Sequence, residues 1–266
     1  MNTFRELHHC AGPLVLPNAW DAGSALAFAH AGFPAVGTTS FGVAASAGRP
    51  DGGHSTQSAT LALVAALRAL PVHVTADIEN GYSDDPREVS DFVAGLAELG
   101  VAGVNLEDSA DSRLVDPAAF AAKVAAVKDR CPDMFVNARV DNLWFAQEAT
   151  VEAVLLRARR YADAGADGIF VPGLAASEDI ERITAAIALP VNVLAHPTLT
   201  VARLGELGVR RVSSGSLPYR AAVDAAVNVA TALRDNGQLP AATPYWEMQS
   251  RLIEFNEAQV SGDAGS

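Results

Sequence analysis

Two carboxylates follow an apolar run near residue 77, in a position where they could bind a cation. The run 72–76 is rich in β-branched residues, as buried strands are, and leads into Asp77-Ile78-Glu79-Asn80-Gly81-Tyr82. Acidic side chains at such a point either cap the next helix or hold a metal ion. Asp85, directly before Pro86, already has the pattern of a helix cap. Asp77 and Glu79 are therefore free for a hard divalent cation such as Mg²⁺, which prefers carboxylate and water oxygens.

Polar side chains also follow the other apolar runs. In chain order they are Asn18 and Asp21, Ser40 and Gly42, Asp77 and Glu79, Glu107 and Asp108, Arg139 and Asp141, Asn192 and His196, and Ser214 and Gly215. The four acids from Asp77 to Asp108 have no lysine beside them and would repel one another unless a cation lay among them. Arg139 offers a planar fork suited to a carboxylate or phosphate of a substrate.

Several mechanisms lack the residue that they require. Lys123 and Lys128 are the only lysines, and both fall inside a helical pattern, which argues against a Schiff-base aldolase or a pyridoxal-phosphate enzyme. The chain has no Gly-x-Ser-x-Gly motif, and Cys10 and Cys131 lie outside the polar positions listed above. Metal-assisted chemistry on a small anionic substrate is the class that these residues favour.

Eight strand–helix rounds position these residues. The predicted strands are Pro13–Pro17, Ala35–Thr39, Val72–Asp77, Gly103–Leu106, Met134–Ala138, Gly168–Val171, Val191–Leu194 and Arg211–Ser214. The predicted helices are Ala22–Ala31, Ser58–Leu70, Pro86–Leu99, Pro117–Arg130, Val151–Ala164, Glu178–Ala188, Val201–Leu207 and Tyr219–Asn236. Eight such units in roughly 250 residues predict a TIM (β/α)₈ barrel, whose site lies at the carboxyl ends of the strands. An open doubly wound sheet is the alternative, but the first predicted strand is not followed by Gly-x-Gly-x-x-Gly.

Length and composition indicate one catalytic domain over residues 1–266. The barrel spans about 12–237, and a C-terminal extension, 238–266, carries an extra amphipathic helix over Tyr245–Ala258 that could pack on its own chain or on a second copy. The formal net charge of -12 argues against nucleic-acid binding. The chain has neither an apolar run long enough for a membrane span nor a signal-peptide pattern, so we expect no membrane partner and a cytoplasmic protein.

Several of these motifs resemble the isocitrate lyase and phosphoenolpyruvate mutase superfamily, which includes 2-methylisocitrate lyase and phosphonopyruvate hydrolase. The resemblance extends over nearly the whole barrel. The matching stretches are Leu16–Asp21, Gly37–Gly42, Gly48–Gly52, Ala76–Tyr82, Gly103–Asp108 and Asn137–Asp141.

The resemblance implies a site that binds Mg²⁺, with Mn²⁺ as the alternative ion. Asp77 would be the direct ligand, while Glu79, Glu107 and Asp51 would hold the ion largely through its waters. It further implies that Ser40 and the amides around Phe41 and Gly42 bind a substrate carboxylate, and that Arg139 holds substrate oxygens. Family members form dimers and tetramers by exchanging their last barrel helix, so a homo-oligomer is expected.

The sequence departs from the family pattern at two places. Glu79 stands where the family has a second aspartate. The segment Ser109–Asp116 contains no Cys, Lys or His, whereas the lyases carry a lysine-and-cysteine loop there whose thiol acts as acid or base. Arg113 could serve as a substrate clamp, and His196, with Asn192 nearby, could serve as a titrating group. His196 could equally be structural.

Three functions stay open on this evidence. The leading one is a Mg²⁺-dependent lyase that makes or breaks a carbon–carbon bond of a small α-keto or 2-hydroxy di- or tricarboxylate through an enolate. In that reading Arg139, Glu107 and His196 act in catalysis, and Ser40, Phe41, Gly42, Asp77, Arg139 and Asn192 bind the substrate. The alternatives are a carbon–phosphorus enzyme, with the turn Ser213–Ser216 around a phosphoryl group, and a non-catalytic α-keto acid binder.

Overall fold

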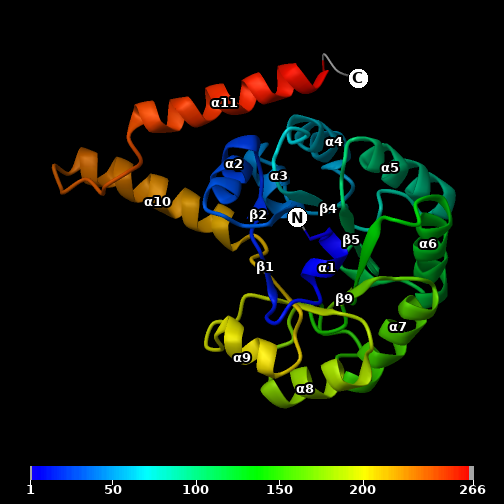
Figure 1. Cartoon of the computed structure of the whole chain (residues 1–266). Coiled ribbons are helices and arrows are strands. Elements are labelled where there is room, and N and C mark those ends of the chain that lie inside the picture. The colour runs from blue at the N-terminus through cyan, green and yellow to red at the C-terminus, as the bar shows by residue number, and fades with distance from the viewer. Residues whose placement is uncertain (1, 264–266) are drawn as a thin grey trace.

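A sheet of nine parallel strands closes into a barrel in the computed structural model, which describes residues 2–263 (Figure 1). The strands of the barrel are β1 (Leu14–Leu16), β2 (Asn18–Ala19), β3 (Ala35–Thr38), β4 (His73–Asp77), β5 (Gly103–Glu107), β8 (Phe135–Arg139), β9 (Gly168–Phe170), β10 (Val191–Leu194) and β11 (Arg211–Ser213). All eight predicted strands are confirmed, within two residues at each end.

The barrel closes across its first strand, which Pro17 divides in two. β1 pairs with β11 on one side and β2 pairs with β3 on the other. Proline has no amide hydrogen to donate, so the regular ladder is interrupted there. Its carbonyl oxygen still accepts from Gly37 N at 2.8 Å. The nine strands of the sheet are therefore the eight predicted ones with the first counted twice.

The helices that surround the barrel match the predicted ones. They are α2 (Ala22–His30), α4 (Gln57–Ala66), α5 (Pro86–Glu98), α6 (Pro117–Arg130), α7 (Val151–Asp163), α8 (Ser177–Ala186), α9 (Val201–Glu206) and α10 (Leu217–Arg234). Outward side chains of the strands, including Val104, Leu106, Val136 and Ala138, form the main apolar core with the inner faces of these helices. The sequence did not predict α1 (Phe4–Leu7), α3 (Ser40–Ser46) or the hairpin of β6 (Ser109–Ala110) and β7 (Arg113–Leu114).

The short helix α1 lies over one mouth of the barrel, near the centre of Figure 1. Its Phe4 packs edge-on against Phe135, with ring centroids 5.4 Å apart. Leu14, Leu16 and Ala35 complete this small apolar cluster, which is the floor of the barrel interior.

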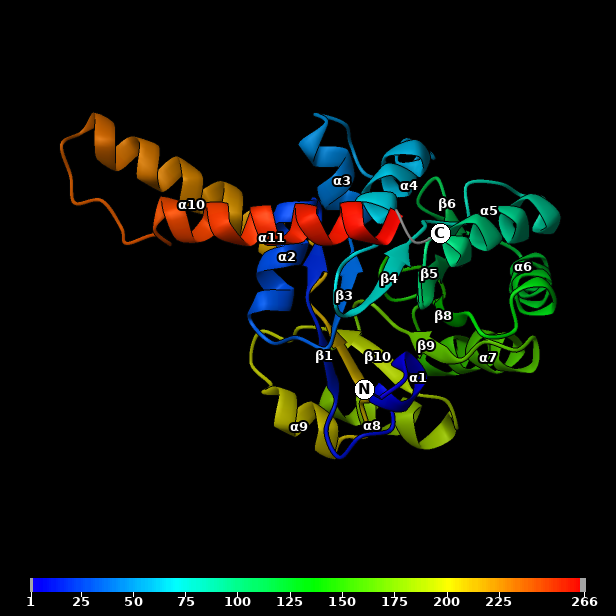
Figure 2. The same ribbon diagram turned by 45° about the horizontal axis from the view of Figure 1, so that its top comes forward.

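The last two helices differ from the others in their packing. None of the 18 residues of α10 is buried, and the helix projects away from the barrel in both views (Figures 1 and 2). The extra helix α11 (Tyr245–Asp263) then returns across the outside of the barrel. It contacts its own chain through Phe255, which packs against the buried apolar cluster that includes Leu63 and Leu67, and through Gln259, which donates to the carbonyl oxygen of Ala66.

Candidate active site

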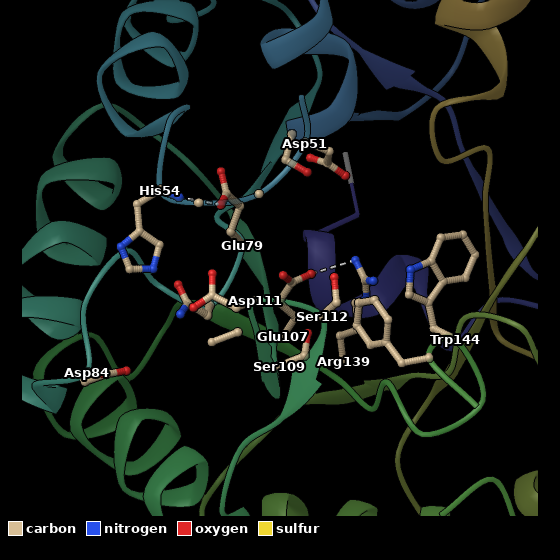
Figure 3. Close-up of a pocket in the computed structure, with 16 residues that line it drawn as sticks. Asp51, His54, Glu79, Asp84, Glu107, Ser109, Asp111, Ser112, Arg139 and Trp144 are labelled. Atoms are coloured by element: carbon tan, nitrogen blue, oxygen red, sulfur yellow. Dashed lines mark hydrogen bonds and ion pairs between the residues drawn. The ribbon is translucent and has the colours of Figure 1, made fainter. Parts of the chain in front are cut away.

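Two cavities meet at the carboxyl ends of the strands, with volumes of about 700 Å³ and about 220 Å³. Both are lined by Ser40, Asp51, Arg139 and Trp144, so they are parts of one site. In Figure 3 the carboxyl groups of Asp51, Glu79 and Glu107 surround the larger cavity, and Trp144 stands at its side opposite His54. Neither of the two lysines lines either cavity.

Asp77 ends β4 and lines the smaller cavity. Its Oδ2 accepts from the backbone amide of Ser40 at 3.0 Å, and its own amide donates to Thr38 Oγ1 at 2.9 Å. Among residues 2–263, no cation forms an ion pair with this carboxylate. Asp85 caps α5 by accepting from Arg87 N at 2.8 Å, as predicted, so the cap does not use Asp77.

Glu79 is held by the segment that follows Asp51. Thr56 Oγ1 donates to one carboxylate oxygen, and the amide of His54 donates to the other at 3.1 Å. Burial raises the pKa of Glu79, these two donors oppose the rise, and the charges of Asp77 and Asp51 add to it. The tight turn after Glu79 needs glycine, because Gly81 has φ of +91° and a Cβ there would lie 2.8 Å from Val89.

Arg139 is fixed between two carboxylates and two aromatic rings. Its Nη1 lies 2.7 Å from Glu107 Oε2, and its Nε donates to Asp141 Oδ1 at 2.6 Å. The guanidinium carbon lies 5.7 Å from the ring centroid of Trp144 and 5.9 Å from that of Phe170. Burial raises the pKa of Glu107, and the nearby acids reinforce this against the opposing charge of Arg139.

Asp108 does not join the acid cluster, which corrects the prediction of four acids around one cation. Successive residues of a strand point to opposite sides, so Glu107 faces the cavity and Asp108 faces the helices. Asp108 is fully buried and accepts from Arg157 Nη1 at 2.9 Å, Tyr161 Oη at 2.6 Å and the amide of Asp141 at 2.8 Å. It therefore supports the strand end that carries Arg139.

The carboxylates fit a divalent ion held mainly through water. Within the described part of the chain, no three His, Cys, Asp or Glu side chains converge closely enough to coordinate one ion directly. Asp51, Asp77 and Glu107 are nevertheless near enough that Asp77 and Asp51 both raise the pKa of Glu107. One direct carboxylate ligand, with the other acids binding the ion's waters, suits Mg²⁺, which usually keeps several waters.

The loop after β5, which departs from the family pattern, is a short hairpin that borders the larger cavity. Ser109, Asp111 and Ser112 line the cavity, and the tip residues Asp111 and Ser112 have left-handed φ of 50° and 60°. Ser109 Oγ donates to Asp141 Oδ2 at 2.6 Å. Gln147 holds the tip and β7: its Nε2 donates to Ser112 O at 2.8 Å, and its Oε1 accepts from Leu114 N at 3.1 Å.

Of the remaining predicted site residues, some line the cavities and others do not. Ser40 and Phe41 line the site, whereas the amide of Gly42 donates to Thr39 Oγ1, which caps α3. Asn192 is buried and lines neither cavity. His196 also lies outside both: its Nε2 is 3.1 Å from Ala175 O, and its Nδ1 accepts from the amides of Thr198 and Leu199. His196 therefore stabilises a loop.

Sequence reasoning missed several residues that line the site, and four of them bear on its chemistry. Trp144 and Phe170 flank Arg139, Asn105 lies on the floor of the smaller cavity, and Arg220 reaches that cavity from the first turn of α10. Asn105 follows the alternation of β5 and could have been identified from the inward positions at Gly103 and Glu107. No local sequence pattern places Arg220 in the site. The residue falls in the first turn of the helix predicted over Tyr219–Asn236, where an arginine is ordinarily exposed to solvent.

Comparisons with known proteins find similarity along nearly the whole chain. The family model described as phosphoenolpyruvate phosphomutase matches residues 4–234. An uncharacterized protein of Mycobacterium tuberculosis is 51% identical over 253 residues, covering 95% of this chain and 97% of its own. The 2-methylisocitrate lyase of Bacillus subtilis is 32% identical over 73% of this chain and 66% of its own. A phosphonopyruvate hydrolase structure with oxalate and Mg²⁺ has a TM-score of 0.83 at 25% identity, covering 97% of this chain and 95% of the other.

Proposed function

The chain belongs to the phosphoenolpyruvate phosphomutase family, and we propose that it is a Mg²⁺-dependent carbon–carbon lyase. Its substrate is a small α-keto or 2-hydroxy di- or tricarboxylate that reacts through an enolate. The observation that carries the proposal is the shared wall of the two cavities, where Arg139 and Ser40 stand beside the acids. Such a wall binds a carboxylate and a carbonyl oxygen next to a cation.

Each side chain has a distinct part in this proposal. Asp77 is the direct ligand of the ion, and Glu79, Glu107 and Asp51 bind its waters. When bound, the ion supplies positive charge that stabilises the enolate oxygen. Arg139 orients the substrate with a guanidinium that Glu107 and Asp141 prevent from rotating. Burial raises the pKa of Glu107, so its carboxylate beside Arg139 is the group best suited to accept and return a proton near the substrate.

The smaller cavity favours a carbon chain with a second anionic group. Phe170, Pro172 and Leu194 give one wall an apolar surface, and Arg220 contributes a cation. A dicarboxylate would place its carbon chain against the apolar wall and its second carboxylate near Arg220.

Carbon–phosphorus chemistry is the second candidate, and the turn Ser214–Ser216 that lines the same cavity favours it. Backbone amides in such a turn can bind a phosphoryl group. The amide of Gly215, however, already donates to Asn18 Oδ1 at 3.1 Å. We therefore rank this reaction below carbon–carbon cleavage.

We also propose that the protein is a homo-oligomer. The apolar residues Val223, Val227 and Leu233 of α10 are between 44% and 67% exposed, and Trp246 of α11 is 76% exposed. An eighth barrel helix with no buried residue leaves apolar area in water that a second copy would cover. We propose that two chains exchange α10, forming a dimer or a pair of dimers.

A substrate panel tests the proposed reaction. The purified protein is incubated with Mg²⁺ and either α-keto or 2-hydroxy dicarboxylates or phosphonopyruvate, and pyruvate, glyoxylate and phosphate are measured. Release of a keto acid from a dicarboxylate, lost after chelation, supports the lyase; phosphate release selects the second candidate. Thermal stabilisation by Mg²⁺ and a keto acid without turnover of any substrate would identify a non-catalytic binder.

A further inference from the structure

A fully buried arginine crosses the barrel interior beneath the proposed site. Arg211 begins β11, and its Nη2 donates to Asn105 Oδ1 of β5 at 3.1 Å. β11 and β5 are not neighbours, because β10, β9 and β8 stand between them in the sheet. The bond therefore spans the inside of the barrel, above Phe4, whose ring centroid lies 6.0 Å from the guanidinium carbon.

Stability alone does not account for this side chain. Arg211 is 0% exposed, and its Nε and Nη1 have no hydrogen-bond partner within residues 2–263. Burial lowers its pKa to about 9, because the barrel interior solvates the charge poorly. Buried charges without a full set of partners are costly, and apolar residues of similar volume often replace them without loss of stability.

The guanidinium determines how the amide of Asn105 is oriented. Arginine can only donate hydrogen bonds, so Asn105 must present its oxygen to Arg211. The same Oδ1 also accepts from Asn137 Nδ2 at 2.8 Å, which occupies both lone pairs. Asn105 Nδ2 has no hydrogen-bond acceptor within residues 2–263, and the residue lines the smaller cavity beside Asp77, its partner in the strand register.

From this geometry we infer that Asn105 is a substrate-binding donor and that Arg211 is the positioning residue that keeps its amide hydrogens directed into the cavity. The inference rests on the proposed function in one respect: the acceptor is an anionic oxygen of a bound keto acid or its enolate. Such an oxygen would be repelled by Oδ1 if the amide turned over. Arg211 therefore acts through Asn105 and never touches the substrate.

Replacing Arg211 separates this role from a structural one. Arg211→Met removes the donor but keeps the volume, so the melting temperature should stay within about 3 °C of the unmodified protein or rise. The control is Arg157→Met, which strips the buried Asp108 of its cation and should lower the melting temperature by more than about 6 °C. An equal loss in both variants would overturn the inference, because it would make Arg211 structural.

Oxalate binding in Mg²⁺, measured by calorimetry, tests the positioning. We expect affinity to fall at least about 10-fold in Arg211→Met and less in Arg211→Lys, which still donates to Oδ1. Asn105→Asp should lose affinity while keeping its stability, because a carboxylate can pair with Arg211 but cannot donate. Unchanged affinity in Arg211→Met would reject the inference and leave the proposed function intact.

A spectroscopic measurement decides the case without any ligand. The side-chain ¹⁵N resonance of Asn105, assigned by its absence in Asn105→Asp, should be single in the unmodified protein and doubled or shifted in Arg211→Met as the amide turns. An unaltered resonance in Arg211→Met would contradict the inference. Failure of the unmodified protein to bind oxalate would instead count against the proposed function.

Discussion

The carboxylate of Asp77 accepts a hydrogen bond from the backbone amide of Ser40, with Oδ2 and N 3.0 Å apart. This contact joins the end of β4 to the start of α3, and the other oxygen, Oδ1, accepts no hydrogen bond from residues 2–263. We therefore expect Asp77→Ala to weaken Mg²⁺-dependent oxalate binding by at least about 100-fold, because a direct ligand contributes several kcal/mol. Calorimetry with and without Mg²⁺ measures this.

Asp85→Ala is the matched control for that substitution. It removes a cap from α5 and should cost about 1 kcal/mol of the free energy of unfolding, with little change in oxalate affinity. If both variants bound oxalate equally well, Asp77 would not be the ligand.

Arg139→Met should both unfold more easily and fail to bind oxalate. Glu107 and Asp141 would then be left largely buried without their cation, at a cost of about 3–5 kcal/mol of unfolding free energy. Urea denaturation measures the loss. Arg139→Lys, which keeps the charge but not the fork, should lose less stability. Full stability of the Met variant would show that the two ion pairs of Arg139 do not stabilise the fold.

The burial of His8 predicts that the free energy of unfolding decreases at acidic pH. Burial is the main cause that lowers its pKa to about 3, against an ordinary value of 6.5, and its ring stacks on Phe135 at 4.2 Å. The unfolded chain therefore binds a proton between pH 6.5 and 3 that the folded chain does not. Stability should fall as pH falls through this window, by up to about 1.4 kcal/mol per pH unit.

Unfolding experiments across pH 4 to 7 check that slope in two variants. His8→Gln should flatten it, whereas His9→Gln, a change to an exposed neighbour, should leave it as it is. Identical slopes in the two variants would rule out His8 as the source.

The exposed face of α10 predicts that the protein associates. Val227→Glu would place a charge in the proposed interface and should shift the mass measured by light scattering from a dimer or tetramer toward the monomer. Leu156→Glu on α7 is the control, since that side chain is also exposed, at 68%, but lies on a different helix. A monomeric unmodified protein would refute the exchange of α10.

The hairpin after β5 should depend on Gln147. Removing its two hydrogen bonds in Gln147→Ala should accelerate hydrogen exchange at the amide of Leu114 by at least about fivefold, since a net hydrogen bond contributes about 1 kcal/mol. Exchange in β5 should not change. Equal protection of Leu114 in both proteins would mean that the hairpin is held by other contacts.

The sequence alone determined the barrel and the place of its site. Short apolar runs alternate with alanine-rich helical patterns, and this alternation sufficed to locate all eight strands, because each strand is defined by its own residues. Asp77, Glu79, Glu107 and Arg139 follow from the same reasoning, since the ends of parallel strands meet at one edge. The carboxylates among these residues then indicated that the site binds a cation.

Tertiary structure decided what depends on direction and on distant partners. Glu107 faces the cavity and Asp108 does not, because the pleat turns one in and the other out. His196 could titrate near neutral pH by residue type, but backbone groups of Ala175 and Leu199 hydrogen-bond to its two ring nitrogens. In the sequence, Arg211 is an ordinary polar residue at the start of a predicted strand, and only the closed barrel brings it to Asn105, 106 positions away. Such contacts leave no local pattern, because they exist only once the sheet has closed.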